Sequence, residues 1–121
     1  MLFNDFYTCH DIQHTDGKVS CRLVFNAAHD IFKGHFPGNP VVPGVCMMEI
    51  VKELLQQEVN KTLILRNTGN VKFLQLITPE SQPLIDISWK ENEDGYSVSA
   101  TLNSGTSALF KLAGTYGLLE Y

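Results

Sequence analysis

A histidine and a glutamate, His35 and Glu49, are the residues of this sequence whose types and surroundings could carry out acid–base chemistry. His35 lies in a stretch, residues 34–44, that holds three prolines and three glycines, and Glu49 lies in the apolar run that follows. Imidazole changes charge near neutral pH, and a carboxyl group in apolar surroundings can hold a proton there. Together they could take a proton from one substrate atom and deliver one to another.

The proline- and glycine-rich stretch has the composition of a rigid, sharply bent loop, because proline fixes φ and glycine permits conformations closed to other residues. Pro43 fits the first position of a following helix, where its missing N–H costs nothing. The amides of Gly44, Val45 and Cys46 would then be unpaired donors of the first helical turn. Such donors could hold a developing oxyanion, which makes Gly44 and Val45 candidate substrate-binding residues.

Hydrophobic periodicity predicts a single α+β domain over residues 1–121, with one long helix and five or six strands. The helix is expected at residues 43–59, where its first two turns are apolar nearly all round. Alternation of apolar and polar residues predicts strands at residues 19–25, 62–76 with a break near 67–70, 85–90, 96–102 and about 107–116.

The segment from Gly34 to Val45, followed by Glu49 on a helix, resembles the G-H-F-P-x-x-P-x-x-P-G-V motif of the hotdog-fold 3-hydroxyacyl-(acyl carrier protein) dehydratases. A weaker similarity covers Val71-Lys72-Phe73 and Pro79. The resemblance implies a hotdog fold, in which a curved antiparallel sheet of five or six strands wraps around one long central helix. It also implies a lyase that converts 3-hydroxyacyl-acyl carrier protein thioesters to trans-2-enoyl thioesters, in fatty-acid or related lipid or polyketide-like synthesis, without a cofactor.

The same resemblance implies roles for individual residues. His35 would take the C2 proton, Glu49 would donate a proton to the departing C3 hydroxyl or orient it, and the amide of Gly44 would hold the thioester oxygen. The family places its histidine and carboxylate on different subunits, so a homodimer or higher homo-oligomer with shared active sites is expected. An acyl tunnel would be lined by Phe36, Met47, Met48 and Val51, although ordinary core packing also accounts for each of them.

Simpler interpretations of the two central residues stay open at this point. Glu49 could begin a solvated polar stripe and pair with Lys52, and His35 could merely cap backbone groups. The chain also departs from the family, since Glu53 stands where the family usually has glutamine. Two carboxylates one turn apart would titrate together if both were buried. Two arginines of the family's second motif are also missing from residues 72–81.

Three other functions remain alternatives. A hotdog acyl thioesterase would direct Glu49 toward water. An enoyl hydratase would use an Asp-x-x-x-x-His arrangement, which Asp30 and His35 satisfy in spacing. A non-catalytic hotdog module would bind acyl chains without turnover, and it would need neither His35 nor Glu49.

Composition argues against several partners. The net charge is −4 and the nine lysines and arginines are scattered, so no nucleic-acid partner is expected. Acyl carrier proteins are acidic, so docking one requires a local basic patch, for which Lys33 and Lys72 are candidates. His10 and His14 suggest no third metal ligand, and we expect no metal.

Three cysteines, Cys9, Cys21 and Cys46, have no paired metal-ligand spacing and are expected to be reduced packing residues. That pattern favours a cytoplasmic protein. We also expect neither a signal peptide nor a membrane-spanning segment.

Overall fold

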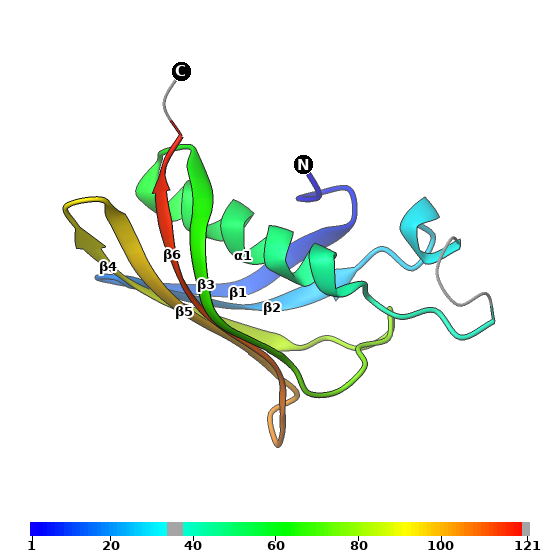
Figure 1. The fold of residues 1–121 in the computed structure, drawn as a ribbon. Helices are drawn as coiled ribbons and strands as arrows, with labels where there is room; N and C mark the ends of the chain where they lie inside the picture. The colour runs from blue at the N-terminus through cyan, green and yellow to red at the C-terminus, as the bar shows by residue number, and fades with distance from the viewer. Residues whose placement is uncertain (34–37, 120–121) are drawn as a thin grey trace.

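The computed structural model of the chain describes residues 1–33 and 38–119, and it has one long helix against one sheet (Figure 1). The elements in chain order are β1 (Tyr7–Thr15), β2 (Lys18–Phe25), a short 3-10 helix (Asp30–Lys33), α1 (Gly44–Val59), β3 (Leu63–Phe73), β4 (Leu84–Asn92), β5 (Gly95–Asn103) and β6 (Ala108–Leu118). No helix within the described ranges combines the length and apolarity needed to cross a membrane.

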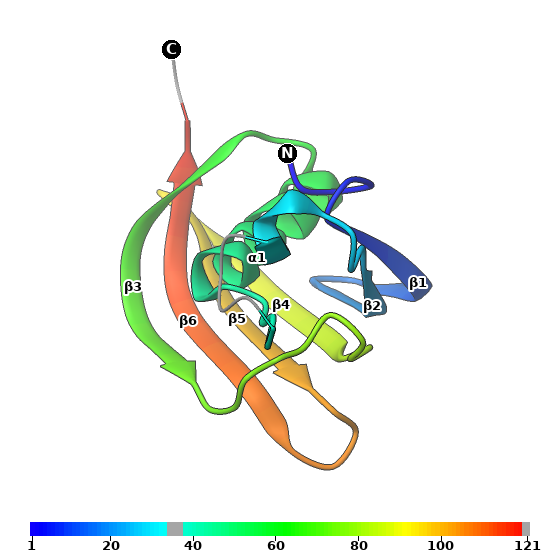
Figure 2. The same cartoon turned by 90° about the vertical axis from the view of Figure 1, so that its right-hand side faces the viewer.

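The six strands form one antiparallel sheet in the order β1-β2-β4-β5-β6-β3. Alternation puts one face of each inner strand against the helix: in β5, Tyr96, Val98 and Ala100 are buried, whereas Ser97 and Ser99 are exposed. The sheet curves, and α1 lies in its hollow (Figure 2). The α+β hotdog architecture expected from the sequence is therefore confirmed.

Helix α1 supplies the centre of the core, with Ile50, Val51 and Leu55 fully buried. It begins one residue later than predicted. Pro43 is the residue before the helix, with an extended backbone (φ −62°, ψ 145°), and its carbonyl accepts a hydrogen bond from the amide of Cys46 at 3.0 Å. The prediction that the Cys46 amide is an unpaired donor is therefore wrong, because the first helical turn closes on Pro43.

Strand β3 is continuous, which corrects the predicted break near residues 67–70. Its pairing with β6 shifts register twice, between Leu65 and Asn67 and between Thr68 and Asn70. Bulges of this kind insert an extra residue without ending the strand, and they explain why the alternation fails there. The strand ends at Phe73 rather than at residue 76.

The sixth strand is β1, which the sequence analysis did not predict. β1 lies at one edge of the sheet, next to β2. Most of its side chains are exposed, and a register shift falls between His10 and Gln13. An edge strand with so little burial has no apolar alternation from which it could be recognised.

Candidate active site

A cavity of about 470 Å³ lies between α1, β3 and the end of β6. One wall is formed by the first three turns of α1, and the other by the start of β3 with Tyr116 and the residue after β6. The lining is Val45, Met48, Glu49, Lys52, Leu63, Ile64, Leu65, Tyr116 and Leu119. The walls are mostly apolar, and three side chains bring a carboxylate, an ammonium group and a phenol into the cavity.

Glu49 is the acidic residue of this cavity, and its side chain keeps 35% of its surface exposed. Its Oε1 lies 3.0 Å from Lys52 Nζ, one helical turn along the same face. The sequence is compatible with two roles for Glu49: a buried, protonated acid, or a polar residue paired with Lys52. The structure pairs the Glu49 side chain with Lys52, and it places that side chain in a mostly apolar cavity.

Tyr116 projects from β6 toward the same cavity, opposite Leu65 of β3 and Tyr96 of β5. Its side chain is almost fully buried. Burial, followed by the nearby negative charge of Glu49, raises the pKa of Tyr116 to about 12. The phenol therefore stays protonated at neutral pH and can only donate or share its proton there, not carry a charge.

The N-terminus of α1 is at one end of this region. Within the described residues, no hydrogen bond satisfies the amides of Gly44 and Val45, which remain available as donors. The ring of Phe73 packs on Gly44 so closely that a side chain there would come within 2.7 Å of the ring. The segment leading into the helix is held by a hydrogen bond from Val42 N–H to Ile77 O at 2.7 Å.

The other predicted site residues fall into three groups. Val45, 75% exposed, and Met48 line the cavity beside Glu49. Met47 and Val51 are buried in the core on other faces of the helix. His35 and Phe36 lie outside the described residues, so their roles stay predictions.

Glu53 differs from Glu49 in its surroundings, although it lies one turn further along α1. It is completely buried and accepts hydrogen bonds from the amides of Leu2 and Phe3, each at 2.9 Å, and from the Tyr7 hydroxyl at 3.1 Å. Burial and the Glu53 charge raise the pKa of Tyr7 well above its ordinary range. Glu53 thus fastens the N-terminal segment to the helix, and it does not share the cavity of Glu49.

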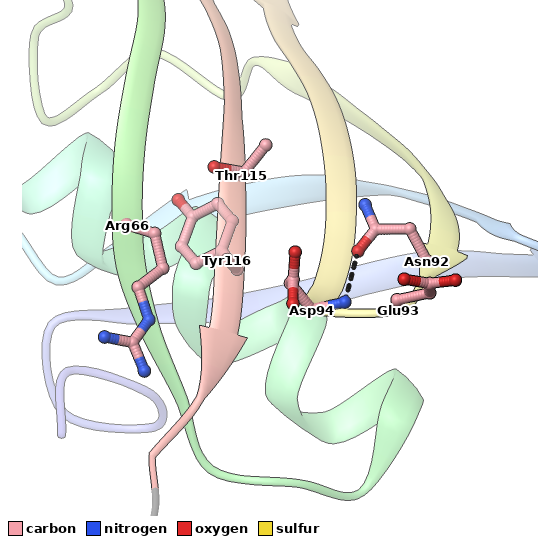
Figure 3. Close-up of a pocket in the computed structure, with 6 residues that line it drawn as sticks. All are labelled: Arg66, Asn92, Glu93, Asp94, Thr115 and Tyr116. Carbon is pink, nitrogen blue, oxygen red and sulfur yellow. Dashed lines mark hydrogen bonds between the residues drawn. The ribbon is translucent and has the colours of Figure 1, made fainter.

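A second cavity, of about 710 Å³, lies at the β4–β5 turn (Figure 3). It is lined by Arg66, Asn92, Glu93, Asp94, Thr115 and Tyr116. Figure 3 shows Arg66 on the β3 side of β6 and the acidic turn on the other side, with the Asp94 amide bonded to the Asn92 side chain at 3.0 Å. Its lining is polar, so it suits an acyl chain less well than the cavity of Glu49.

His10 and His14 each contact a nearby polar side chain. His10 contacts Thr8 at 2.9 Å and His14 pairs with Glu58 at 2.8 Å. Among the residues that the structure describes, no three histidine, cysteine or acidic side chains converge as a metal site. Lys72 faces Lys111 directly across β3 and β6.

Tyr116 is the polar cavity residue that could not be identified from the sequence. It is one apolar position among several in the last strand, and nothing in its neighbours distinguishes it. The register of β6 against β3 places it near Glu49, and that register depends on two bulges.

The chain is similar to proteins of known activity. It matches segments of proteins named 3-hydroxyacyl-[acyl-carrier-protein] dehydratase FabZ: in Wolbachia pipientis wMel with 42% identity over 69 residues (51% of this chain, 47% of the relative), and in Ralstonia nicotianae with 26% identity over 104 residues (75% and 62%). The match covers about half the length of the first of these relatives.

Two solved structures share the fold of this chain, and a family profile matches it. A structure described as the dehydratase heterocomplex ApeI:P from Xenorhabdus doucetiae is similar in fold, with a TM-score of 0.72, 22% identity, and 87% of this chain and 91% of that chain covered. An uncharacterised protein from Erwinia carotovora has a TM-score of 0.61 at 23% identity, with 92% and 91% covered. The profile described as ApeI dehydratase matches residues 11–109. Because that match covers most of the chain, the protein belongs to the ApeI-like dehydratase family.

Proposed function

We propose that this protein removes water from 3-hydroxyacyl thioesters carried on acyl carrier protein and produces trans-2-enoyl thioesters. The observation that carries the proposal is the cavity beside α1, where the Glu49 carboxylate stands among apolar walls near the helix N-terminus. The amides of Gly44 and Val45 there have no hydrogen-bond partner among the described residues. A cavity of this kind suits an aliphatic chain with a polar group near one end. Family membership and the FabZ relatives support the reaction type.

The proposed chemistry divides between two groups and a backbone donor. His35 takes the proton from C2, and the thioester oxygen, where negative charge develops, accepts a hydrogen bond from the Gly44 amide, with Val45 beside it. The bond between C3 and its hydroxyl then breaks. Glu49 donates a proton to that hydroxyl or orients it, and the product is water with a C2–C3 double bond.

The ion pair with Lys52 sets a condition on Glu49. To act as an acid, the carboxylate has to separate from Lys52 and take up a proton before the reaction. To act as an orienting group it keeps its charge and accepts a hydrogen bond from the C3 hydroxyl, and the proton taken by His35 then completes the water molecule.

We also propose that the enzyme is a cytoplasmic homo-oligomer, at least a dimer, with sites shared between subunits. Support comes from the open position of the cavity, which includes Ile64 on the edge strand β3, and from exposed apolar residues near the end of that strand, Phe73, Leu74 and Leu76. A second subunit would cover this surface and deepen the cavity. Localisation is supported by the free cysteines.

The test is incubation of purified protein with 3-hydroxyacyl carrier-protein thioesters, with the enoyl product followed by mass spectrometry. His35→Ala and Glu49→Gln are each expected to lower kcat/KM by about 10²–10⁴-fold, the usual contribution of an acid–base group. Glu58→Gln is the matched control, since it removes a carboxylate from the same helix outside the cavity. Full turnover in both site variants would refute the assigned roles, and absence of enoyl product from the wild type would refute the reaction.

One observation favours thioesterase activity as a second candidate. Glu49 lies beside Lys52, and a carboxylate in that position could act as the base that activates water toward a thioester carbonyl. Product analysis separates the two, because a thioesterase releases the free acid and the free carrier thiol, whereas a dehydratase leaves the thioester intact.

A further inference from the structure

Tyr116 holds a position in the cavity that neither the motif residues nor the family match explains. It lies on β6, in the last strand of the chain, and meets Glu49 only because β6 pairs with β3 beside the helix. Tyr116 is 2% exposed and belongs to the core, and it is also one of the residues that line the cavity of Glu49.

The hydroxyl of Tyr116 differs from those of the other described tyrosines. The Tyr7 hydroxyl donates to Glu53 at 3.1 Å, and the Tyr96 hydroxyl reaches Glu91 at 3.4 Å. Tyr116 has no hydrogen bond to any other described residue, and in that part of the chain every fully buried side-chain oxygen or nitrogen has a partner. Its hydroxyl is therefore not fully enclosed by the described residues, and Tyr116 is among the residues that line the cavity of Glu49.

The chemistry of the site suits a neutral donor at this place. The Glu49 carboxylate is an acceptor, and its charge favours the protonated phenol beside it. A substrate hydroxyl needs both an acceptor for its proton and a donor for its oxygen lone pairs. Glu49 supplies the acceptor from the α1 wall of the cavity, and Tyr116 supplies the donor from the β6 wall.

We propose that Tyr116 is a substrate-binding residue whose hydroxyl donates a hydrogen bond to the C3 hydroxyl oxygen of the acyl thioester, while Glu49 engages the same hydroxyl from α1. This inference rests on the dehydratase function proposed above. It gives the site a means of selecting 3-hydroxyacyl groups over saturated acyl groups, because only the former offer an oxygen to Tyr116.

The variant that tests this is Tyr116→Phe, which deletes one oxygen and keeps the ring. The matched control is Tyr96→Phe, because Tyr96 is the directly opposite residue on β5 and its hydroxyl is outside the cavity. Both are made in a His35→Ala background, so that a 3-hydroxyacyl ligand is not consumed during the measurement. Thermal unfolding of each variant checks that the fold is retained.

The measurement is the dissociation constant of two thioesters of equal chain length on acyl carrier protein, one 3-hydroxyacyl and one saturated. Tyr116→Phe is expected to weaken 3-hydroxyacyl binding by about 3- to 10-fold, the size of one neutral hydrogen bond, and to change saturated acyl binding less than about twofold. Tyr96→Phe is expected to leave both constants unchanged.

Equal weakening of both ligands by Tyr116→Phe would overturn the inference, since it would mean that Tyr116 only packs. Unchanged binding of both would overturn it as well. Either result leaves the proposed reaction standing if the wild type forms enoyl product. If the wild type forms none, the reaction fails, whereas a hydroxyl-selective loss in Tyr116→Phe would still identify a 3-hydroxyacyl binding site.

Discussion

Glu49 and Glu53 are two carboxylates one turn apart on the same helix, and their surroundings separate their roles. Glu49 stands in a cavity beside Lys52, whereas Glu53 is buried under the first residues of the chain. The sequence could place both on a helix and could identify Glu49 from its motif. It could not show that Glu53 is buried, because the amides that bind it lie 50 and 51 positions away.

We expect Glu53→Gln to destabilise the protein. Glutamine keeps one acceptor oxygen but turns an N–H₂ group toward donors from Leu2, Phe3 or Tyr7, so at least one of these buried or part-buried donors loses its partner. Hydrogen bonds to charged groups contribute about 1.5–3 kcal/mol each, so a loss of that order in the free energy of unfolding is expected. Urea denaturation measures it.

Glu58→Gln serves as the comparison for this prediction. Glu58 pairs with His14, whose side chain is 60% exposed, and such surface pairs contribute about 0–1 kcal/mol. Equal losses in the two variants would contradict the view that Glu53 anchors the N-terminal segment.

Tyr116 predicts a dependence of stability on alkaline pH. Its pKa is raised from 10.0 to about 12 in the folded protein, so between those values the unfolded state releases a proton that the folded state keeps. The contribution of Tyr116 to the free energy of unfolding is therefore fully present below pH 10. It is lost as the pH rises from 10 to about 12, and the loss is at most about 3 kcal/mol.

Urea unfolding of the wild type and Tyr116→Phe at pH 8 and at pH 11 checks this. The wild type is expected to lose more stability between the two pH values than the variant does. The variant still declines, because the pKa of Tyr7 is raised too. Identical declines would show that Tyr116 ionises alike in both states.

At the scale of elements, the strands that could be predicted are those with one buried face. β4, β5 and β6 alternate because the helix covers one side of each. β1 was missed because it is an exposed edge strand, and β3 was misjudged because its two bulges break the period without breaking the pairing. The helix was predicted to within one residue of its start, since proline and the apolar run mark it.

The β4–β5 turn gives a prediction at this scale. Gly95 begins β5 with φ +143°, and a Cβ there would lie 2.1 Å from the backbone oxygen of Tyr116. Gly95→Ala therefore forces β5 and β6 apart. We expect it to lower the free energy of unfolding by about 1–3 kcal/mol more than Gly105→Ala does, the usual cost of overpacking.

Gly105 is a fair control because it also has positive φ, +96°, but open space around it. Its substitution therefore reports the cost of backbone conformation alone. If the two alanine variants unfold at the same denaturant concentration, the close contact between β5 and β6 is not a constraint on the fold.

For the whole molecule, the placement of the cavity at the edge strand makes the assembly the central question. The resemblance predicts that His35 of one subunit works with Glu49 of another. Composition and periodicity could not decide whether the two residues of a site belong to the same subunit. The expectation of shared sites comes only from the family motif in the sequence. The shape of the sheet surface at edge strand β3 could not be predicted from the sequence, because it depends on how β3 bends along β6.

Mixing two inactive variants tests shared sites directly. If each site combines two subunits, His35→Ala and Glu49→Gln dimers that are unfolded, mixed in equal amounts and refolded regain about a quarter of wild-type turnover. Half of the dimers then carry both variants, and each of these has one intact and one doubly altered site.

Each variant refolded alone is the control and is expected to stay inactive. No recovery on mixing, with dimers verified by sedimentation, would place His35 and Glu49 of each site on the same chain.

The fastening of the N-terminus by Glu53 has a consequence for how the chain is made. Leu2 and Phe3 leave the ribosome about fifty residues before their acceptor on α1, and β2 waits longer still for β4. Contacts so distant along the chain slow folding, because a long loop must close before they form. The contacts of Leu2 and Phe3 with Glu53 can therefore form only after helix α1 has been synthesised.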